Sequence, residues 1–232
     1  MSNTVAVIQT CTGNLTTSKK FYEKLGFTKV STNDQTVYTD GKMLIEINPT
    51  NTARVGLKLY HSDWQKNIQL LKQKTAILEI ENGYLLSDPN GIKVYLVNGA
   101  IPYEYALSDN SFALPGNFAG LSIEAIDMPS TIAFWEALGY QKTMGSMEQG
   151  WMAFDNGSGI GISIMKSLAC PHLFFNPGLT YFNSGQNLPI IKKIKAAGIP
   201  IAEEITVFNK EGIVDNIILC DPGGLGFFIF ND

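Results

Sequence analysis

The chain has 232 residues, of which 45% are hydrophobic and 16% charged, with a formal net charge of −4. This length allows one large domain or two of about 100 residues each, and we expect two. No run of Lys and Arg marks a nucleic-acid partner. No segment approaches the roughly 18 apolar residues of a membrane span. We therefore predict a protein that does not bind nucleic acid or membranes and whose partner is a small molecule.

The N-terminus and the cysteines favour a cytoplasmic protein. The first residues, MSNTVAVIQT, show no basic region followed by an apolar segment and a cleavage site. The three cysteines, Cys11, Cys170 and Cys220, lack metal-binding spacing, so we expect reduced thiols. Cys170 and His172 are a candidate nucleophile and base. We favour loop residues instead, because residues so close in sequence seldom reach the required geometry.

The sequence contains an internal repeat. SKKFYEKLGFTKV (Ser18 to Val30) aligns without a gap with TIAFWEALGYQKT (Thr131 to Thr143). LSDPNGIKVYLVN (Leu86 to Asn98) aligns in the same way with LCDPGGLGFFIFN (Leu219 to Asn231). We therefore predict two copies of one unit, residues 1–100 and 117–232, joined by a linker over residues 101–116.

The first copy begins with one strand, one helix and three strands. VAVIQTCT is an expected strand, and Thr16 or Thr17 is the expected cap of a helix that has Phe21 and Leu25 on one face and ends at Gly26. FTKVST, TVYT and KMLIEIN follow as short strands separated by Asn, Asp and Gly turns.

The same order recurs three times. VGLKLY precedes a helix from Ser62 or Asp63 and the strands AILEI, GYLLS and IKVYLV. The third unit starts at GLSIEAI, with Pro129 in the first turn of its helix, and the fourth starts at GLTYF, with a helix that ends before Gly198. Four βαβββ modules account for nearly the whole chain, so we predict an α+β fold.

FYEKLGF and FWEALGY after a strand, with DPNG and DPGG before the last strand of each copy, resemble the vicinal oxygen chelate superfamily. This superfamily includes glyoxalases, extradiol dioxygenases and bleomycin-resistance proteins. The resemblance covers essentially the full length. It implies two tandem glyoxalase-like domains with cupped mixed sheets, helices on the outer face and a ligand on the inner face. One such scaffold hosts several chemistries, so it leaves the function open.

The resemblance also indicates where relatives hold a metal. The first-strand ligand positions fall on Val7, Arg54, Gly120 and Pro177, and the last-strand positions fall on Glu46, Tyr95, Ser163 and Phe228. Only Glu46 is a carboxylate, whereas a divalent cation needs several donors. We therefore expect neither a metal nor a cofactor. Glu46 is expected to face a cation of its own protein, Arg54 or Lys58.

Strand alternation predicts which residues face the inside of each cup. The first cup receives Glu46, Arg54, Lys58 and Tyr95, either as a partly buried ion network or as an anion-binding pocket. The second cup receives an aromatic and apolar set, which is Ser122, Glu124, Trp151, Met165, Tyr181, Phe228 and Phe230. Such a cleft suits a small organic ligand, but the same rings could pack as core. Small residues at Gly120, Gly161 and Gly226 favour a cavity.

Three functions remain open. The first hypothesis is a metal-independent protein of the glyoxalase and bleomycin-resistance type that binds an organic molecule in the second cup, with Ser122 and Glu124 orienting it. The second is a metal-independent lyase, isomerase or hydrolase that uses Glu46 or Glu124 as general base. The third is a structural or regulatory module without a ligand. A monomeric pseudo-dimer and a homodimer are both compatible with the repeat, and the pairing of the modules in space is left open.

Overall fold

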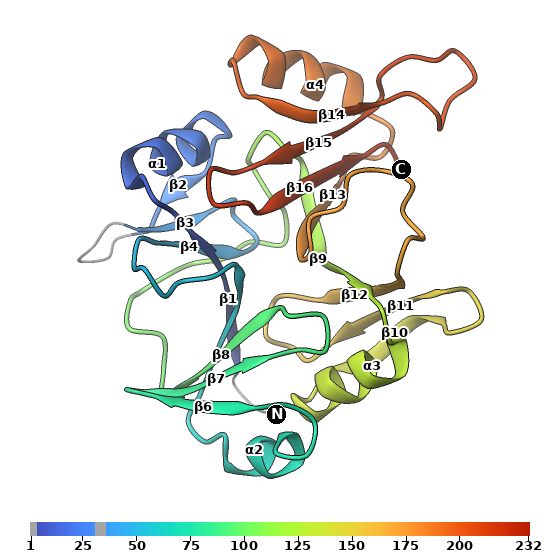
Figure 1. The fold of residues 1–232 in the computed structure, drawn as a ribbon. Helices are drawn as coiled ribbons and strands as arrows, with labels where there is room; N and C mark the ends of the chain where they lie inside the picture. Colours follow the sequence, from blue (N-terminus) through green and yellow to red (C-terminus); the bar gives the residue numbers. More distant parts are fainter. Residues whose placement is uncertain (1–3, 31–35) are drawn as a thin grey trace.

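Residues 4–30 and 36–232 are described in the computed structural model, which consists of two eight-stranded mixed sheets and four helices (Figure 1). The helices are α1 (Leu15–Lys24), α2 (Gln65–Leu71), α3 (Met128–Ala137) and α4 (Asn187–Ala196). The first sheet contains β1 (Val5–Cys11), β2 (Thr28–Lys29), β3 (Val37–Thr39), β4 (Leu44–Asn48), β5 (Gly56–His61), β6 (Ile77–Ile80), β7 (Gly83–Ser87) and β8 (Lys93–Asn98). The second contains β9 (Asn117–Ala125), β10 (Gln141–Ser146), β11 (Trp151–Asp155), β12 (Ile162–Lys166), β13 (Gly178–Phe182), β14 (Ile201–Ile205), β15 (Asn216–Cys220) and β16 (Gly226–Phe230).

The two sheets have the same topology. Their strand orders are β2-β3-β4-β1-β5-β8-β7-β6 and β10-β11-β12-β9-β13-β16-β15-β14. Within each sheet the two modules join through their first strands, β1 with β5 and β9 with β13, which run antiparallel. The modules therefore pair within each copy. The predicted α+β fold of four βαβββ modules is confirmed.

The helix starts differ from the prediction in detail. Asn14, and not Thr16 or Thr17, caps α1, because its side chain accepts the backbone N–H of Thr17 at 3.1 Å. In α3, Pro129 lies in the first turn as expected, after the cap residue Asp127. Of the expected strand FTKVST only β2 forms, and Ser31 and Thr32 lie outside the described residues.

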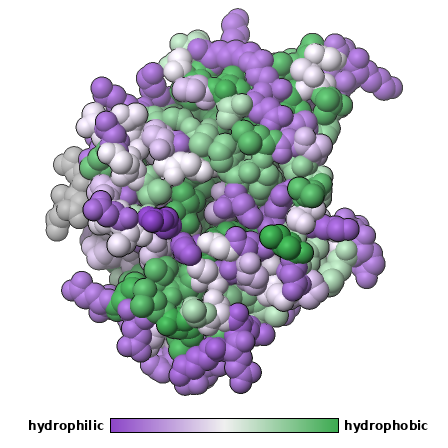
Figure 2. Space-filling model, in the orientation of Figure 1, coloured by the Kyte–Doolittle hydropathy of each residue, from purple (hydrophilic) through white to green (hydrophobic). Residues whose placement is uncertain are grey.

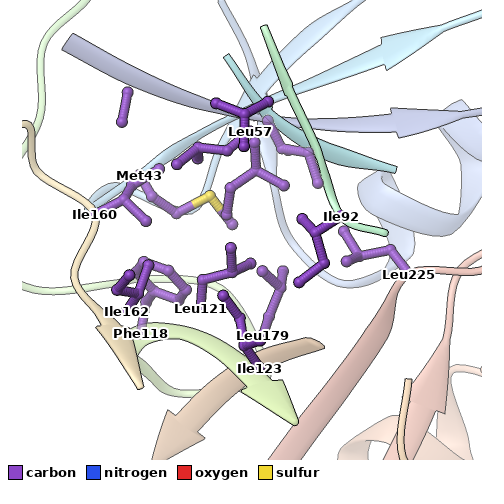
Figure 3. Close-up of a cluster of buried hydrophobic side chains, with 14 of the residues drawn as sticks. Met43, Leu57, Ile92, Phe118, Leu121, Ile123, Ile160, Ile162, Leu179 and Leu225 are labelled. Atoms are coloured by element: carbon purple, nitrogen blue, oxygen red, sulfur yellow. The ribbon is translucent and has the colours of Figure 1, made fainter. Parts of the chain in front are cut away.

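One large apolar core lies between the two sheets. Met43, Leu57 and Ile92 of the first copy point toward Leu121 and Leu179 of the second copy (Figure 3). All are almost fully buried. The sheet faces that carry these side chains are opposite to the cups, so the two cups are separated by the shared core.

Each first helix of a copy packs against the other copy. Phe21 of α1 lies edge-on to Phe227 of β16, with ring centroids 5.8 Å apart. Asn90, in the DPNG turn, donates from Nδ2 to Thr131 Oγ1 of α3 at 3.0 Å. The two copies therefore form one joint structure through equivalent elements (Figure 1).

The outer surface carries both hydrophobic and hydrophilic residues. Figure 2 shows hydrophobic surface in the middle of the face that Figure 1 presents, with hydrophilic surface around its edges. Within residues 4–30 and 36–232, no helix is long and apolar enough to cross a membrane.

Candidate functional site

A cavity of about 320 Å³ opens on the inner face of the second sheet. Strands β9, β11, β12, β13 and β16 form its floor, and the connection after β12 covers one side. Its walls are largely apolar. The lining residues are Ala119, Gly120, Ser122, Met144, Trp151, Ala153, Ser163, Met165, Cys170, Phe174, Thr180, Phe182, Phe228 and Phe230.

Small residues on the central strands form the floor of the cavity and leave space above it. Ser163 of β12 lies opposite Ser122 of β9, and Thr180 of β13 lies opposite both Gly120 of β9 and Phe228 of β16. A Cβ on Gly178 would lie 2.5 Å from the Phe228 ring, so glycine lets this ring lie against β13. The cavity therefore lies above Gly120, Ser122, Ser163 and Thr180, beside the Phe228 ring.

Aromatic rings form one wall of the cavity. Phe228 packs at a tilt against Phe174, with ring centroids 4.9 Å apart, and against Phe230, with centroids 6.0 Å apart. Trp151 and Met165, opposite each other on β11 and β12, line another part. Such a surface favours planar apolar groups, since aromatic pairs add about 0.5–1.5 kcal/mol beyond area burial.

Hydroxyl groups supply the polar part of the cavity lining. Ser122 Oγ and Thr180 Oγ1 are 2.6 Å apart and share one hydrogen bond. The Ser163 hydroxyl also lines the cavity and has no hydrogen-bond partner among the described residues. A hydroxyl donates one bond and accepts two, so this group has capacity left for a ligand.

The expectation that Tyr181 faces the cup is wrong. Tyr181 is fully buried in the core and stacks on Phe227 at 6.0 Å, whereas its neighbour Thr180 lines the cavity. The alignment placed the start of this strand at Pro177, but the pairing of Gly178 with Ser122 makes Gly178 the equivalent residue. A one-residue shift moves every side chain of a strand to the other face.

Glu124 lies near the cavity but is not among its lining residues. Its backbone N–H donates to Asn176 Oδ1 at 3.3 Å, and its carbonyl accepts from Asn176 Nδ2 at 2.9 Å. The carboxylate atom Oε1 is buried without a hydrogen-bond partner in the described part of the chain. Glu124 lies two residues from the floor residue Ser122 on β9, but only Ser122 lines the cavity.

Cys170 lines the cavity, but it does not form a pair with the His172 ring. His172 Nδ1 lies 3.0 Å from Glu203 Oε1 instead. Burial raises the pKa of the Cys170 thiol, and the nearby Glu124 and Glu203 carboxylates raise it further, against a hydrogen bond from the His172 backbone. A thiol with a raised pKa is a poor nucleophile at neutral pH.

The first cup is filled by side chains. Val7, Val37, Leu44 and Tyr60 form an apolar cluster on its inner face with Val30. Ile101 and Tyr103, at the start of the connection between the copies, pack onto this cluster. The two cups therefore differ, although their strands have the same order.

Glu46 faces Lys58 in the first cup. Lys58 Nζ donates to both carboxylate oxygens, at 2.7 and 2.8 Å, and both side chains are largely buried. Arg54 does not join this pair, because its guanidinium donates to the carbonyls of Asn51 and Ala53. Its backbone N–H donates to the Tyr95 hydroxyl at 3.3 Å. The alignment was two residues off here, since the strand pairing makes Gly56 the equivalent of Val7.

The residues at the expected metal positions do not fit a divalent cation. In the first cup, both Glu46 oxygens are bound by an ammonium group, and Val7, Gly56 and Tyr95 supply no second carboxylate or imidazole. In the second cup, the equivalent positions carry Gly120, Gly178, Ser163 and Phe228. No group of three or more His, Cys, Asp or Glu residues suited to a metal occurs in the described residues.

Sequence reasoning missed part of the cavity. The missed lining residues are Ala119, Met144, Ala153, Cys170, Phe174, Thr180 and Phe182. Ala153 could have been found, because it lies two residues from Trp151 on one strand and shares its face. Phe174 carries no periodic signal, since it lies in an irregular connection.

Comparisons with known proteins identify the fold. The chain is similar to the Mn(II)-bound glyoxalase from Novosphingobium aromaticivorans, with 13% identity, a TM-score of 0.60, and coverage of 98% of this chain and 81% of that one. It is similar to the 2,3-dioxygenase LapB from Pseudomonas sp. KL28, with 13% identity, a TM-score of 0.59, and coverage of 98% and 91%. A variant of homoprotocatechuate 2,3-dioxygenase from Brevibacterium fuscum shares 14% identity with a TM-score of 0.61 over 100% and 72%. No protein-family model and no curated protein sequence matches the chain.

These likenesses show that the chain has the fold of these glyoxalase and 2,3-dioxygenase structures over its full length. The likeness in sequence motifs is thus accompanied by a likeness in architecture. At 12–14% identity it shows the fold alone.

Proposed function

We propose that this chain, built on the fold of glyoxalases and extradiol dioxygenases, binds a small organic molecule in the cavity of the second cup without a divalent metal. The observation that carries the proposal is the contrast between the two cups. The first is filled by its own apolar cluster and an ion pair, whereas the second keeps a cavity of about 320 Å³. Ligand pockets in proteins are commonly about 300–1,000 Å³.

The lining favours an aromatic or otherwise flat apolar ligand with one polar group. Trp151, Phe174 and Phe228 offer ring faces and edges at the walls. The Ser122–Thr180 hydroxyl pair and Ser163 offer hydrogen bonds at the floor. None of the lining residues is charged. The ligand is accordingly neutral at the end that it buries.

The donor set supports the proposed metal independence. The only carboxylate at the expected metal positions, Glu46, is neutralised by Lys58, in the cup that lacks the cavity. The hydroxyls of the second cup are weak ligands for a divalent cation compared with carboxylates and imidazoles. We therefore expect ligand binding to be unchanged by a chelator.

The test measures binding to the second cup directly. Native mass spectrometry of the purified protein should detect a copurifying organic molecule, and calorimetric titration with p-cresol and 2-naphthol should show binding with and without EDTA. Ala153→Phe places a ring in the cavity and should abolish binding. Ala202→Phe adds the same ring at an exposed position of β14 and should leave binding unchanged. Equal affinity of both variants for the probes would rule out this site.

An enzymatic function is the second candidate, and one observation favours it. Glu124 Oε1 is buried without a partner among the described residues, and its carboxylate is close enough to raise the pKa of Cys170, a residue of the cavity wall. A ligand that extended from the cavity to Glu124 would meet a carboxylate that could act as a general base. Glu46 is a poorer candidate base, because Lys58 binds both of its oxygens.

Glu124→Gln distinguishes the two functions. If the chain only binds, the substitution should leave the affinity for p-cresol and 2-naphthol within about twofold, because Glu124 does not line the cavity. If the chain is an enzyme with Glu124 as base, turnover of its substrate should fall by about 10²-fold or more while binding persists.

A further inference from the structure

A second cavity, of about 460 Å³, lies between α1 and the turn that follows α4. In Figure 1, α1 of the first copy lies beside the β15–β16 turn of the second copy, with α4 above it. Phe21, Ile199 and Pro200 line an apolar wall, and Lys20 and Lys24 line the side formed by α1. This cavity is remote from both cups, since it lies on the helical side of the sheets.

The two lysines have no anionic partner in the described part of the chain. They lie four residues apart on α1, so they occupy the same face of the helix, where like charges repel. Glu23, also on α1, pairs with Lys29 at 2.9 Å. In the second copy, Glu204 of β14 pairs with Lys195 of α4 at 2.7 Å.

The Lys24 ammonium group reaches the opposite wall. A Cβ on Gly198 would lie 3.9 Å from Lys24 Nζ. Gly198 has a φ of 62°, so it takes the left-handed conformation that ends α4. Positive charge therefore lies directly beside the apolar residues Ile199 and Pro200 that follow this turn.

The repeat provides an internal comparison. The alignment of FYEKLG with FWEALG makes Ala133 and Ala137 of α3 the equivalents of Lys20 and Lys24. There, Asn67 Nδ2 of α2 donates to the Ala137 carbonyl at 2.8 Å and holds the two helices in contact. The lysines and the cavity therefore occur together at the interface of α1. At the equivalent interface, α3 has alanines in place of the lysines and accepts a hydrogen bond from α2.

We propose that this cavity binds a small amphipathic anion. Its carboxylate lies between the ammonium groups of Lys20 and Lys24, and its short hydrocarbon part covers Phe21, Ile199 and Pro200. An anion removes the repulsion between the two lysines, and its apolar part removes this wall from water. The site is independent of the ligand proposed for the second cup.

Octanoate is the probe, and amide chemical shifts of the ¹⁵N-labelled full chain are the readout. Titration should shift the amides of Lys20, Lys24 and Gly198 in a saturable way. Lys20→Ala with Lys24→Ala, which copies α3, should weaken binding at least tenfold. Lys19→Ala removes one charge from the same helix outside the cavity and should change affinity less than twofold. Octanol, with the same chain and no charge, should bind at least tenfold more weakly than octanoate.

Several results would overturn the proposal. Octanoate could shift only amides of the second cup, such as those of Gly120 and Ser163. Octanol could bind as tightly as octanoate, or the double alanine variant could keep wild-type affinity. An equal loss in Lys19→Ala would also overturn it, because the effect would then be one of overall charge. If the double alanine variant is less stable, Lys20→Gln with Lys24→Gln retains the aliphatic stems and should show the same loss.

Discussion

The Tyr22 hydroxyl donates to Asp221 Oδ2 at 2.7 Å, and Thr10 Oγ1 donates to the same oxygen at 2.7 Å. The backbone N–H groups of Gly223 and Leu225 donate to the other oxygen, Oδ1. Tyr22 belongs to FYEKLG of the first copy, and Asp221 belongs to DPGG of the second. The two motifs that reveal the repeat thus meet across the interface between the copies.

Tyr22→Phe should lower the free energy of unfolding by about 1–3 kcal/mol, because it leaves a buried carboxylate oxygen with one side-chain donor fewer. Urea unfolding measures this change. Tyr38→Phe is the matched control, since the Tyr38 hydroxyl bonds at 3.2 Å to the exposed Glu23, and it should cost less. A larger loss in Tyr38→Phe than in Tyr22→Phe would contradict the importance of the cross-copy bond.

The Glu46–Lys58 pair should behave as a coupled unit. Glu46→Gln or Lys58→Met alone leaves one largely buried charge without its partner, so each should destabilise the fold. The double variant should lose less than the sum of the two, with a coupling free energy of about 0.5–3 kcal/mol. Additive losses in urea unfolding would show that the two side chains do not interact. Affinity for ligands of the second cup should not change, since that cavity lies on the other sheet.

Stability should decrease in alkaline solution through Tyr60. Burial, together with the charge of Glu46, raises the pKa of Tyr60 to about 12. Between the ordinary tyrosine pKa of about 10 and this value, the unfolded chain releases the proton and the folded chain retains it. The free energy of unfolding therefore falls as pH rises, by at most about 1.4 kcal/mol per pH unit from this group.

Tyr60→Phe removes this titration and isolates its contribution. Urea unfolding of both proteins between pH 9 and pH 12 should show a shallower decline for the variant. Parallel declines would mean that Tyr60 ionises equally in both states.

Substitution of Thr180 should change ligand binding, whereas substitution of its neighbour Tyr181 should not. Thr180→Val removes a hydroxyl that bonds Ser122 at the cavity floor and should change the affinity for 2-naphthol by about twofold to tenfold, equivalent to about 0.5–1.5 kcal/mol. Tyr181→Phe alters a side chain in the core and should leave affinity unchanged. Calorimetric titration of both variants measures these affinities. A loss of affinity in Tyr181→Phe with none in Thr180→Val would place β13 in the other register.

The sequence was sufficient for the fold because its signals are local and repeated. Spacing within FYEKLG predicts a helix with Phe21 and Leu25 on one face, and both are buried in the structure. The strands followed from short apolar runs between turn residues. The errors arose where the first strands of the second and fourth modules were aligned without a shared motif. A shift of one residue at Pro177 was enough to put Tyr181 on the wrong face.

By itself, the sequence determined that the chain is two copies of one βαβββ pair and that only one carboxylate, Glu46, occupies an expected metal position. Only the tertiary structure decided which cup is open. Ile101 and Tyr103 pack onto the apolar cluster of the first cup. In the second cup, Phe174 and Phe175 pack onto the cluster around Phe228, and a cavity of about 320 Å³ remains beside them. Filling of a cup depends on contacts between segments far apart in the chain, and strand periodicity, which is a local property, carries no information about them.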